Sequence, residues 1–178
     1  GTLVVNENFL PGTSDFRTQI TTIKSKHPKA IFMPTQTGTA LGIFVKQWHE
    51  QQGDLNVPLH TTFVAAPNPD AHKIAGDLLK GVAYMDPSYA PDSPRYKKFL
   101  SYYEDDYGIE PSIPFHSAGA VDTLDMLQQY LDSHDHFDKE EFKNFLLTSV
   151  KNYDGLMGKF SFDAEGNADL GFKIATIE

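Results

Sequence analysis

A group of polar side chains near the start of the chain has residue types that bind small molecules. Thr35, Gln36 and Thr37 follow the apolar run 30–34, and a pattern typical of a helix begins just after them. The unpaired backbone N–H groups and the dipole at a helix N-terminus attract an anionic group such as a carboxylate. A threonine at this place can also serve only as the cap of the helix. The two interpretations are compatible, so residues 35–37 are the first candidates for a binding site.

Two further loops place candidate residues at the same predicted edge. A short strand is expected within residues 58–64 and another over 81–85. The carboxyl ends of parallel strands meet at one edge of a sheet, where open α/β sheets bind small molecules. An aromatic ring in these loops could stack on a ligand, although ordinary packing is the alternative for each residue alone. The candidates in these loops are Phe63, Ala65, Asp86 and Tyr89.

These loops depend on an alternation of strands and helices in the first half of the chain. Strands are predicted at residues 3–5, 30–33, 58–64 and 81–85. The run 30–33 is continuously apolar, as expected of a strand covered on both faces. One helix is predicted after a cap at Ser14 or Asp15, and a second begins at about Thr39 with Trp48 on its buried face. The alternation predicts a doubly wound α/β layer.

The second half of the chain is predicted to be mostly helical. Three prolines within residues 87–94 interrupt regular structure, and a helix with a Ser93 cap follows them. A long helix is expected over residues 117–131, and Asp138 with Glu141 fits the capping box of another.

The chain ends in two extended segments, 158–163 and 172–177. Both alternate in polarity, and a turn that contains Gly166 lies between them. This pattern is consistent with a hairpin.

Composition excludes several classes of protein. The 178 residues carry a net charge of −9, which is unsuited to a phosphate backbone, so no nucleic-acid partner is predicted. The chain has no cysteine, so disulfides, thiolate metal sites and cysteine nucleophiles are excluded. No apolar run approaches the roughly 20 residues that span a bilayer, so the chain is not expected to cross a membrane.

Recognised motifs for catalysis or cofactor binding are absent from the sequence. Neither a phosphate-binding glycine loop nor a GxSxG elbow can be written from it. The cluster at residues 134–136 (HDH) fits a polar turn better than a metal site, and the acids of residues 104–106 fit the end of a helix. We therefore predict no catalytic residues, no metal and no cofactor.

Several segments together resemble the periplasmic leucine/isoleucine/valine-binding protein family, which supplies substrate-binding components to ABC importers. Five pieces in the family's order carry the resemblance. They are residues 11–20 (PGTSDFRTQI), 29–34 (KAIFMP), 74–77 (IAGD) with 80–82 (KGV), Asp122 within a helix, and 155–167 (GLMGKFSFDAEGN).

The resemblance implies an α/β fold, the three-layer Rossmann-like parallel sheet of a type I periplasmic binding protein with additional helices. By the family's pattern, residues 1–86 belong to the second lobe, which binds ligand. The mostly helical residues 87–160 belong to the other lobe, and residues 161–178 hold a strand that returns to the α/β lobe. The chain would then be about the carboxyl-terminal half of a member.

The function implied is non-catalytic binding of a small molecule by hinge closure and its delivery to an ABC transporter permease. The place implied is the periplasm, or the outer surface of a Gram-positive cell with a lipid anchor. An extracellular module of a signalling receptor with the same fold and an α/β enzyme are the alternatives. A half-fold would expose apolar helix faces between residues 93 and 150, which favours homo-oligomers or domain swapping.

Two departures from the family's pattern concern the ligand. Its amino-acid binders place an aromatic residue near Gln36 and Thr37 and an acid near Phe63 and Val64, where this chain has neither. An ammonium group would lack its counter-charge in a closed cleft, which is costly. The sequence therefore argues against an ordinary α-amino acid as the ligand.

Overall fold

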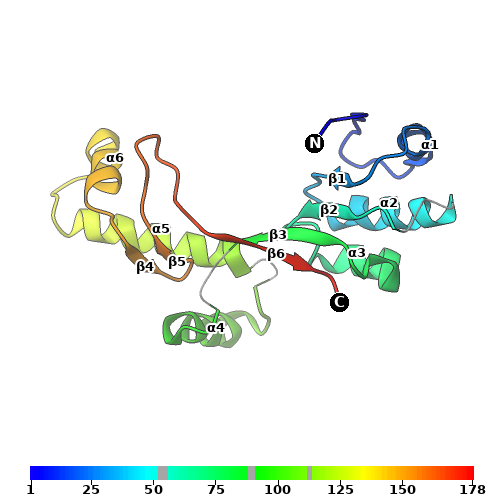
Figure 1. Cartoon of the computed structure of the whole chain (residues 1–178). Helices are drawn as coiled ribbons and strands as arrows, with labels where there is room; N and C mark the ends of the chain where they lie inside the picture. Colours follow the sequence, from blue (N-terminus) through cyan, green and yellow to red (C-terminus); the bar gives the residue numbers. More distant parts are fainter. Residues whose placement is uncertain (52–55, 88–90, 112–113) are drawn as a thin grey trace. The chain divides into compact units, whose positions relative to one another are not determined.

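The computed structural model describes residues 1–51, 56–87, 91–111 and 114–178. Contacts divide the chain into a sheet unit, Gly1–Asp86 with Lys173–Glu178, and a helical unit, Pro87–Phe172. The chain therefore passes between the units twice, after Asp86 and after Phe172 (Figure 1). The sequence prediction placed the second boundary at residue 161, whereas residues 161–172 group here with the helical unit.

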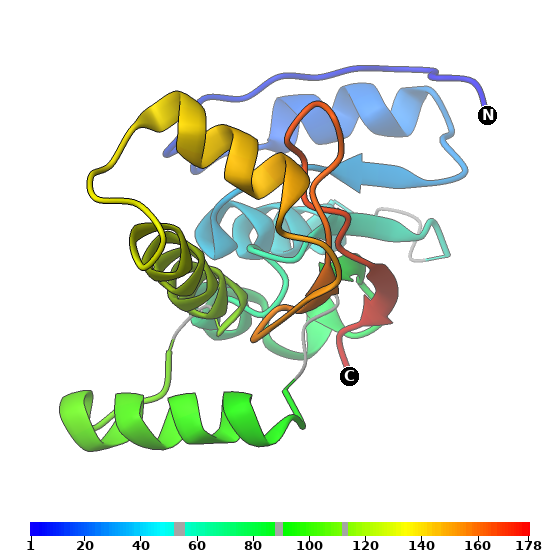
Figure 2. The same cartoon turned by 90° about the vertical axis from the view of Figure 1, so that its left-hand side faces the viewer.

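A four-stranded sheet forms the centre of the sheet unit. Its strands are β1 Ile31–Met33, β2 Leu59–Thr62, β3 Ala83–Pro87 and β6 Phe172–Thr176, which lie side by side in that order. The pairs β1–β2 and β2–β3 are parallel. Gly81 donates to the carbonyl of Ile177 near one end of the β3–β6 pair, and Asp86 lies beside Lys173 near the other. Strand β6 is therefore an antiparallel edge strand on a parallel sheet, and it lies next to β3 in both views (Figures 1 and 2).

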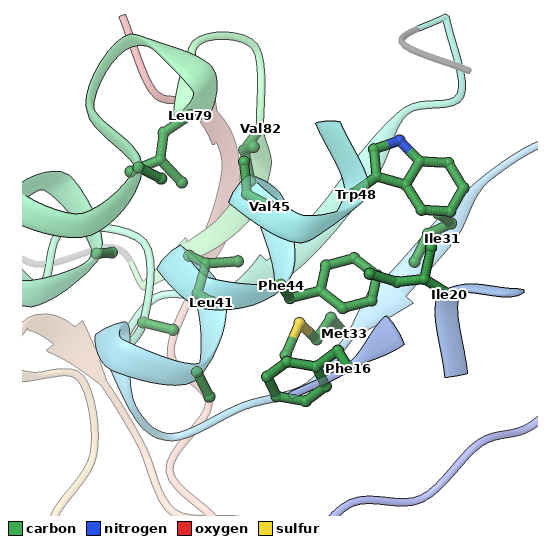
Figure 3. Close-up of a cluster of buried hydrophobic side chains, with 14 residues drawn as sticks. Phe16, Ile20, Ile31, Met33, Leu41, Phe44, Val45, Trp48, Leu79 and Val82 are labelled. Carbon is green, nitrogen blue, oxygen red and sulfur yellow. The ribbon is translucent and has the colours of Figure 1, made fainter. Parts of the chain in front are cut away.

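The helices of the sheet unit bury their apolar faces in one core. They are α1 Arg17–Ser25, α2 Gly38–Glu50, α3 Pro69–Ala75 and the 3₁₀ turn η1 Gly76–Leu79. The predicted stripe of α2 is confirmed, since Leu41, Phe44 and Trp48 are buried. The Phe44 ring packs edge-on against Phe16 at a centroid distance of 5.8 Å and stacks on Trp48 at 6.2 Å. Figure 3 shows this core, whose labelled side chains are Phe16, Ile20, Ile31, Met33, Leu41, Phe44, Val45, Trp48, Leu79 and Val82.

Helices α2 and α3 approach closely because α2 has a glycine at the contact. A Cβ atom on Gly42 would lie 2.9 Å from the Cβ of Ile74 and 3.0 Å from the carbonyl oxygen of Ala71. Both distances are shorter than ordinary carbon contacts. The close packing positions the N-termini of the two helices at the same edge of the sheet.

The opposite face of the sheet carries exposed apolar side chains. Ile31 and Met33 point into the core, whereas Phe32 between them is 66% exposed. The strand register places Phe32 and Met85 on one face, and Met85 is also exposed. The prediction that this strand is covered on both faces is wrong for the described residues, because the helices of the unit pack on the face of Ile31 and Met33.

The predicted strand at residues 3–5 does not form. This segment has no strand pairing, and Leu3 is 79% exposed. β-branched residues favour a strand only where a neighbouring strand offers hydrogen bonds and packing. The apolar pattern of residues 3–5 was therefore not enough to predict a strand.

The start of α1 combines a local and a distant partner. The N-cap residue is Phe16, whose own side chain makes no capping bond, and Oδ1 of Asp15 accepts from the Arg17 amide at 3.1 Å. The Phe16 amide donates to Oε1 of Gln47 at 2.6 Å, and Nε2 of Gln47 donates to the Ser14 carbonyl at 3.2 Å. The predicted contribution of Asp15 is therefore present, and a buried glutamine from α2 adds a partner that the sequence did not indicate.

Three helices and a small hairpin form the helical unit. The helices are α4 Pro94–Tyr107, α5 Pro114–Leu131 and α6 Lys139–Thr148, and the strands are β4 Tyr153–Gly155 and β5 Gly158–Phe160 (Figure 2). The predicted hairpin partners are wrong, because β5 pairs with β4 while β6 joins the other sheet. A bridge between Phe162 and Ala168 closes the turn around Gly166.

The predicted caps of α4 and α6 are confirmed. Oγ of Ser93 accepts from the Tyr96 amide at 3.1 Å. Asp138 accepts from the amides of Glu140 and Glu141 at 2.9 and 3.0 Å. The reciprocal half of the capping box is absent here, because the Asp138 amide donates to the hydroxyl of Tyr130 instead.

A buried carboxylate joins α5 to the β4–β5 turn. Asp122 has no exposed surface and accepts from the amides of Leu156 at 2.7 Å and Met157 at 2.9 Å. A Cβ atom on Gly155 would lie 2.3 Å from Oδ2 of Asp122, so this position requires glycine. Burial raises the pKa of Asp122, and the two amides and Arg95 oppose that rise.

The turn after β5 supports a prediction about pH. Asp163 accepts from the side chain of Asn167 at 3.0 Å and from its amide at 2.8 Å, and these bonds hold the pKa of Asp163 below its ordinary value of 3.8. An acid with a lowered folded pKa stabilises the fold above its unfolded pKa and loses that effect as the pH falls through the folded pKa. Asp163→Asn should therefore lower the melting temperature at pH 7, and the difference from the wild type should fade below about pH 4.

A second variant checks the cause of this effect. Asn167→Ala removes the side-chain donor to Asp163. In this background, Asp163→Asn should lower the melting temperature at pH 7 by less than it does in the wild type. An Asp163→Asn difference that is constant from pH 7 to pH 3 would contradict a role for the charge.

Candidate ligand-binding site

The loop after β1 is built by its threonines. Thr35 is buried, and its hydroxyl oxygen accepts from the Thr37 amide at 3.3 Å. The Thr37 hydroxyl in turn accepts from the Ala40 amide at 3.3 Å and is the N-cap of α2. The capping role of Thr37 is confirmed, and each hydroxyl keeps lone-pair capacity for a further contact.

The α2 N-terminus offers hydrogen-bond donors at this edge. Among the described residues, no acceptor is found for the amides of Gly38 and Thr39. Such first-turn amides are the groups that bind carboxylates at helix ends. Gln36 precedes them and is exposed. Thr39 is exposed, whereas Gly38 is buried against Asn68, so Thr39 offers the more accessible donor for an anionic group.

Thr62 connects the loop after β1 to the loop after β2. Its hydroxyl donates to the Thr35 carbonyl at 2.5 Å and accepts from the Ala65 amide at 3.3 Å. Sequence reasoning missed this residue, although its place at the end of a predicted strand was a usable signal. Thr62 thus fixes two of the candidate loops to each other.

The two candidates after β2 differ in exposure. Phe63 is half-buried, whereas Ala65 is fully buried and belongs to the core of the sheet unit. The Ala65 side chain therefore has no surface to offer a ligand in this conformation. Phe63 follows β2 directly, at the same sheet edge as Gln36.

Asp86 lies at the carboxyl end of β3 and has a partner in the next strand. Its Oδ2 is 3.2 Å from Nζ of Lys173 on β6. Sequence reasoning did not find Lys173, because the two charges are 87 positions apart in the chain and only the sheet brings them together. Tyr89, the last candidate, lies outside the described residues.

The described candidates lie at or just after the carboxyl ends of β1, β2 and β3. Two hollows lie elsewhere. One hollow, of about 350 Å³, is lined by residues of α4 and α5 that include Tyr102 and Tyr107. The other, of about 320 Å³, lies by Pro58 and Val82, near the amino ends of β2 and β3. None of the candidates that the structure describes lines either hollow.

The first residue of the histidine cluster, His134, packs against α5. The His134 ring stacks on Tyr130 at a centroid distance of 4.0 Å, and its Nδ1 is 2.7 Å from the Tyr130 carbonyl oxygen. These contacts close the loop between α5 and α6. The polar turn predicted for residues 134–136 is confirmed.

Comparison with known proteins identifies the family. A family model described as periplasmic binding protein matches residues 1–178, the whole of this chain. The chain belongs to the periplasmic binding protein family, as its motifs predicted. None of the helices in the described parts combines the length and apolar composition needed to cross a bilayer.

Solved structures share the fold at low sequence identity. The chain is similar to the leucine-binding protein LivK from Thermotoga maritima, with 22% identity, a TM-score of 0.75 and 96% of this chain covered. It is also similar to a putative branched-chain amino acid ABC transporter protein from Rhodospirillum rubrum, with 20% identity, a TM-score of 0.74 and 99% covered. A third is an ABC transporter solute-binding protein from Rhodopseudomonas palustris in complex with p-hydroxybenzoic acid, with 21% identity, a TM-score of 0.74 and 94% covered.

These comparisons confirm the predicted type I periplasmic-binding-protein fold, with its parallel-dominated sheet and additional helices. The chain spans 47%, 50% and 46% of those three proteins, which is about half their length. One half of the solved fold is therefore represented here.

Proposed function

We propose that this chain is part of the substrate-binding component of an ABC transporter and binds a small molecule without transforming it. The observation that supports this is the convergence of Thr35, Thr37 and Thr62 at the carboxyl ends of β1 and β2, beside open amides of α2. Parallel α/β sheets bind ligands at this edge. Family membership supports the same role.

The proposed mechanism is hinge closure. The sheet unit is one lobe, the helical unit belongs to the other, and the ligand stabilises the closed form by binding it more tightly than the open form. The closed protein then delivers its ligand to a membrane permease. The proposed location is the periplasm, or the outer surface of a Gram-positive cell with a lipid anchor.

We propose a carboxylate without an α-ammonium group as the ligand. The two described carboxylates at this edge already have partners, since Asp70 accepts from Thr39 at 3.4 Å and Asp86 pairs with Lys173. An ammonium group in a closed cleft needs a counter-charge, whereas a carboxylate suits the α2 N-terminus. The similar protein with p-hydroxybenzoic acid bound supports an aromatic acid, and LivK supports the competing amino-acid class.

A ligand-binding assay tests this proposal on the full-length protein. We expect 4-hydroxybenzoate to raise the melting temperature and leucine to leave it unchanged. Gln36→Ala should weaken the affinity about fivefold, as expected for the loss of one hydrogen bond. Isothermal titration calorimetry measures this ratio.

The matched control is Gln129→Ala, an exposed glutamine on α5 in the helical unit, which should bind as the wild type does. Stabilisation by leucine alone would contradict the ligand class. Equal affinities of Gln36→Ala and wild type for whichever acid binds would contradict the site.

A further inference from the structure

Two residues of opposite charge lie where the chain leaves the sheet unit and where it returns to it. Asp86 is the last residue of the sheet unit before the first passage, and Lys173 is the first residue after the second passage. These two residues form an ion pair with a distance of 3.2 Å between Oδ2 and Nζ. They lie on β3 and β6, which are neighbours in the sheet.

The residue after Asp86 cannot take part in the backbone hydrogen bonding of the sheet as a donor. Pro87 follows Asp86 and has no N–H, so β3 cannot donate a ladder hydrogen bond from the first residue past the pair. Backbone hydrogen bonds that flank the two strands join Ile177 to Gly81 and Val82, at the end away from Pro87. The Asp86–Lys173 contact therefore joins the two strands next to a residue that lacks an amide donor.

The carboxylate of this contact is partly buried, whereas the ammonium group is exposed. The Asp86 side chain is 22% exposed, while that of Lys173 is 67% exposed. A mostly buried carboxylate is screened less by water and salt than an exposed one. The attraction between Asp86 and Lys173 therefore acts where the chain leaves the sheet unit and returns to it.

We propose that the Asp86–Lys173 ion pair is a clamp that holds the two connecting strands together and limits the range of hinge motion between the units. The paired strands inside the clamp then stay together while the units move. The clamp regulates closure of the site, a role that rests on the proposed function. Asp86 accordingly acts as a positioning residue and not as a ligand contact.

Spin-label distance measurements on the full-length protein test the clamp without any ligand. Residues 1–178 contain no cysteine, so Lys26→Cys in the sheet unit and Asn144→Cys on α6 give two labels, with any cysteine outside these residues replaced by serine. Asp86→Asn and Lys173→Gln should each broaden the distance distribution. The double charge swap Asp86→Lys with Lys173→Asp should restore the wild-type width, because it restores the attraction.

Amide hydrogen exchange gives a second, local readout. Exchange in peptides that cover residues 82–87 and 172–177 should rise about twofold to fivefold in the single variants, the range for loss of a partly exposed ion pair. The matched control is Asp77→Asn, which breaks the exposed pair with Lys80, also at 3.2 Å in the sheet unit but away from the connecting strands. This control should change neither readout.

The outcomes separate the clamp from the proposed function. Wild-type widths in both single variants, or a swap as broad as the single variants, would overturn the clamp whatever the ligand is. The single variants could broaden the distances as expected, and the charge swap could restore the width, in a protein that binds neither 4-hydroxybenzoate nor leucine. That outcome would support the clamp and contradict the proposed ligand classes.

Discussion

Asp122→Ala is expected to lower the free energy of unfolding of the helical unit by about 3 kcal/mol, because one buried and one partly buried amide donor lose their acceptor and a buried donor left unpaired costs about 1–3 kcal/mol. The donors are the amides of Leu156 and Met157 at the β4–β5 turn. Urea unfolding followed by circular dichroism measures the overall loss. Amide exchange at the two donors measures it locally.

The control for this prediction is Asp125→Ala on the same helix. Asp125 is partly exposed and pairs with Arg95, so its loss should cost about 1 kcal/mol or less. Equal effects of the two substitutions would contradict a special role for the buried carboxylate.

The pH dependence of Asp122 has the opposite sign to that of Asp163. The folded pKa of Asp122 is raised, so the folded state binds more protons than the unfolded state between the ordinary value of 3.8 and the raised value. The contribution of Asp122 to the free energy of unfolding therefore falls as the pH rises through that window. Asp122→Asn should remove this slope.

Phe44→Ala is the second large effect, with an expected loss of about 3–5 kcal/mol for the sheet unit. The ring is buried and lies between Phe16 and Trp48, so truncation leaves a cavity in the centre of the core. Trp48 is the chain's single tryptophan, so its fluorescence during urea unfolding reports on the sheet unit.

Phe32→Ala is the matched control, because it removes the same ring from the exposed face of β1. In the chain of residues 1–178 its cost should stay within about 0.5 kcal/mol. A cost as large as that of Phe44→Ala in this chain would contradict the assignment of the buried face. A large cost in the full-length protein alone would mean that residues outside this chain form the third layer of the fold.

Elements with local signals were predicted well from the sequence. The caps at Thr37, Ser93 and Asp138 were found because a capping side chain bonds amides two or three residues away, within its own segment. The buried face of α2 was found because a period of 3.6 residues is visible in any linear sequence. The class of fold followed from the alternation of these elements and from the family motifs.

Elements that depend on distant partners were predicted poorly. Gln47, more than 30 positions away, bonds the Phe16 amide at the start of α1, and β5 pairs with β4 where β6 was expected. The pattern at residues 3–5 needed a neighbouring strand that the described residues do not supply. Pairing between strands is non-local, so polarity patterns alone leave the partner open.

The same division runs through the candidate site. The sequence by itself determined that Thr35, Gln36 and Thr37 stand between a strand and a helix, because strand, cap and helix are consecutive in the chain. Only the tertiary structure decided that Thr62 bonds to that loop, that Ala65 turns into the core and that Lys173 neutralises Asp86. These facts arise from sheet register and burial, which bring together residues that the chain keeps far apart.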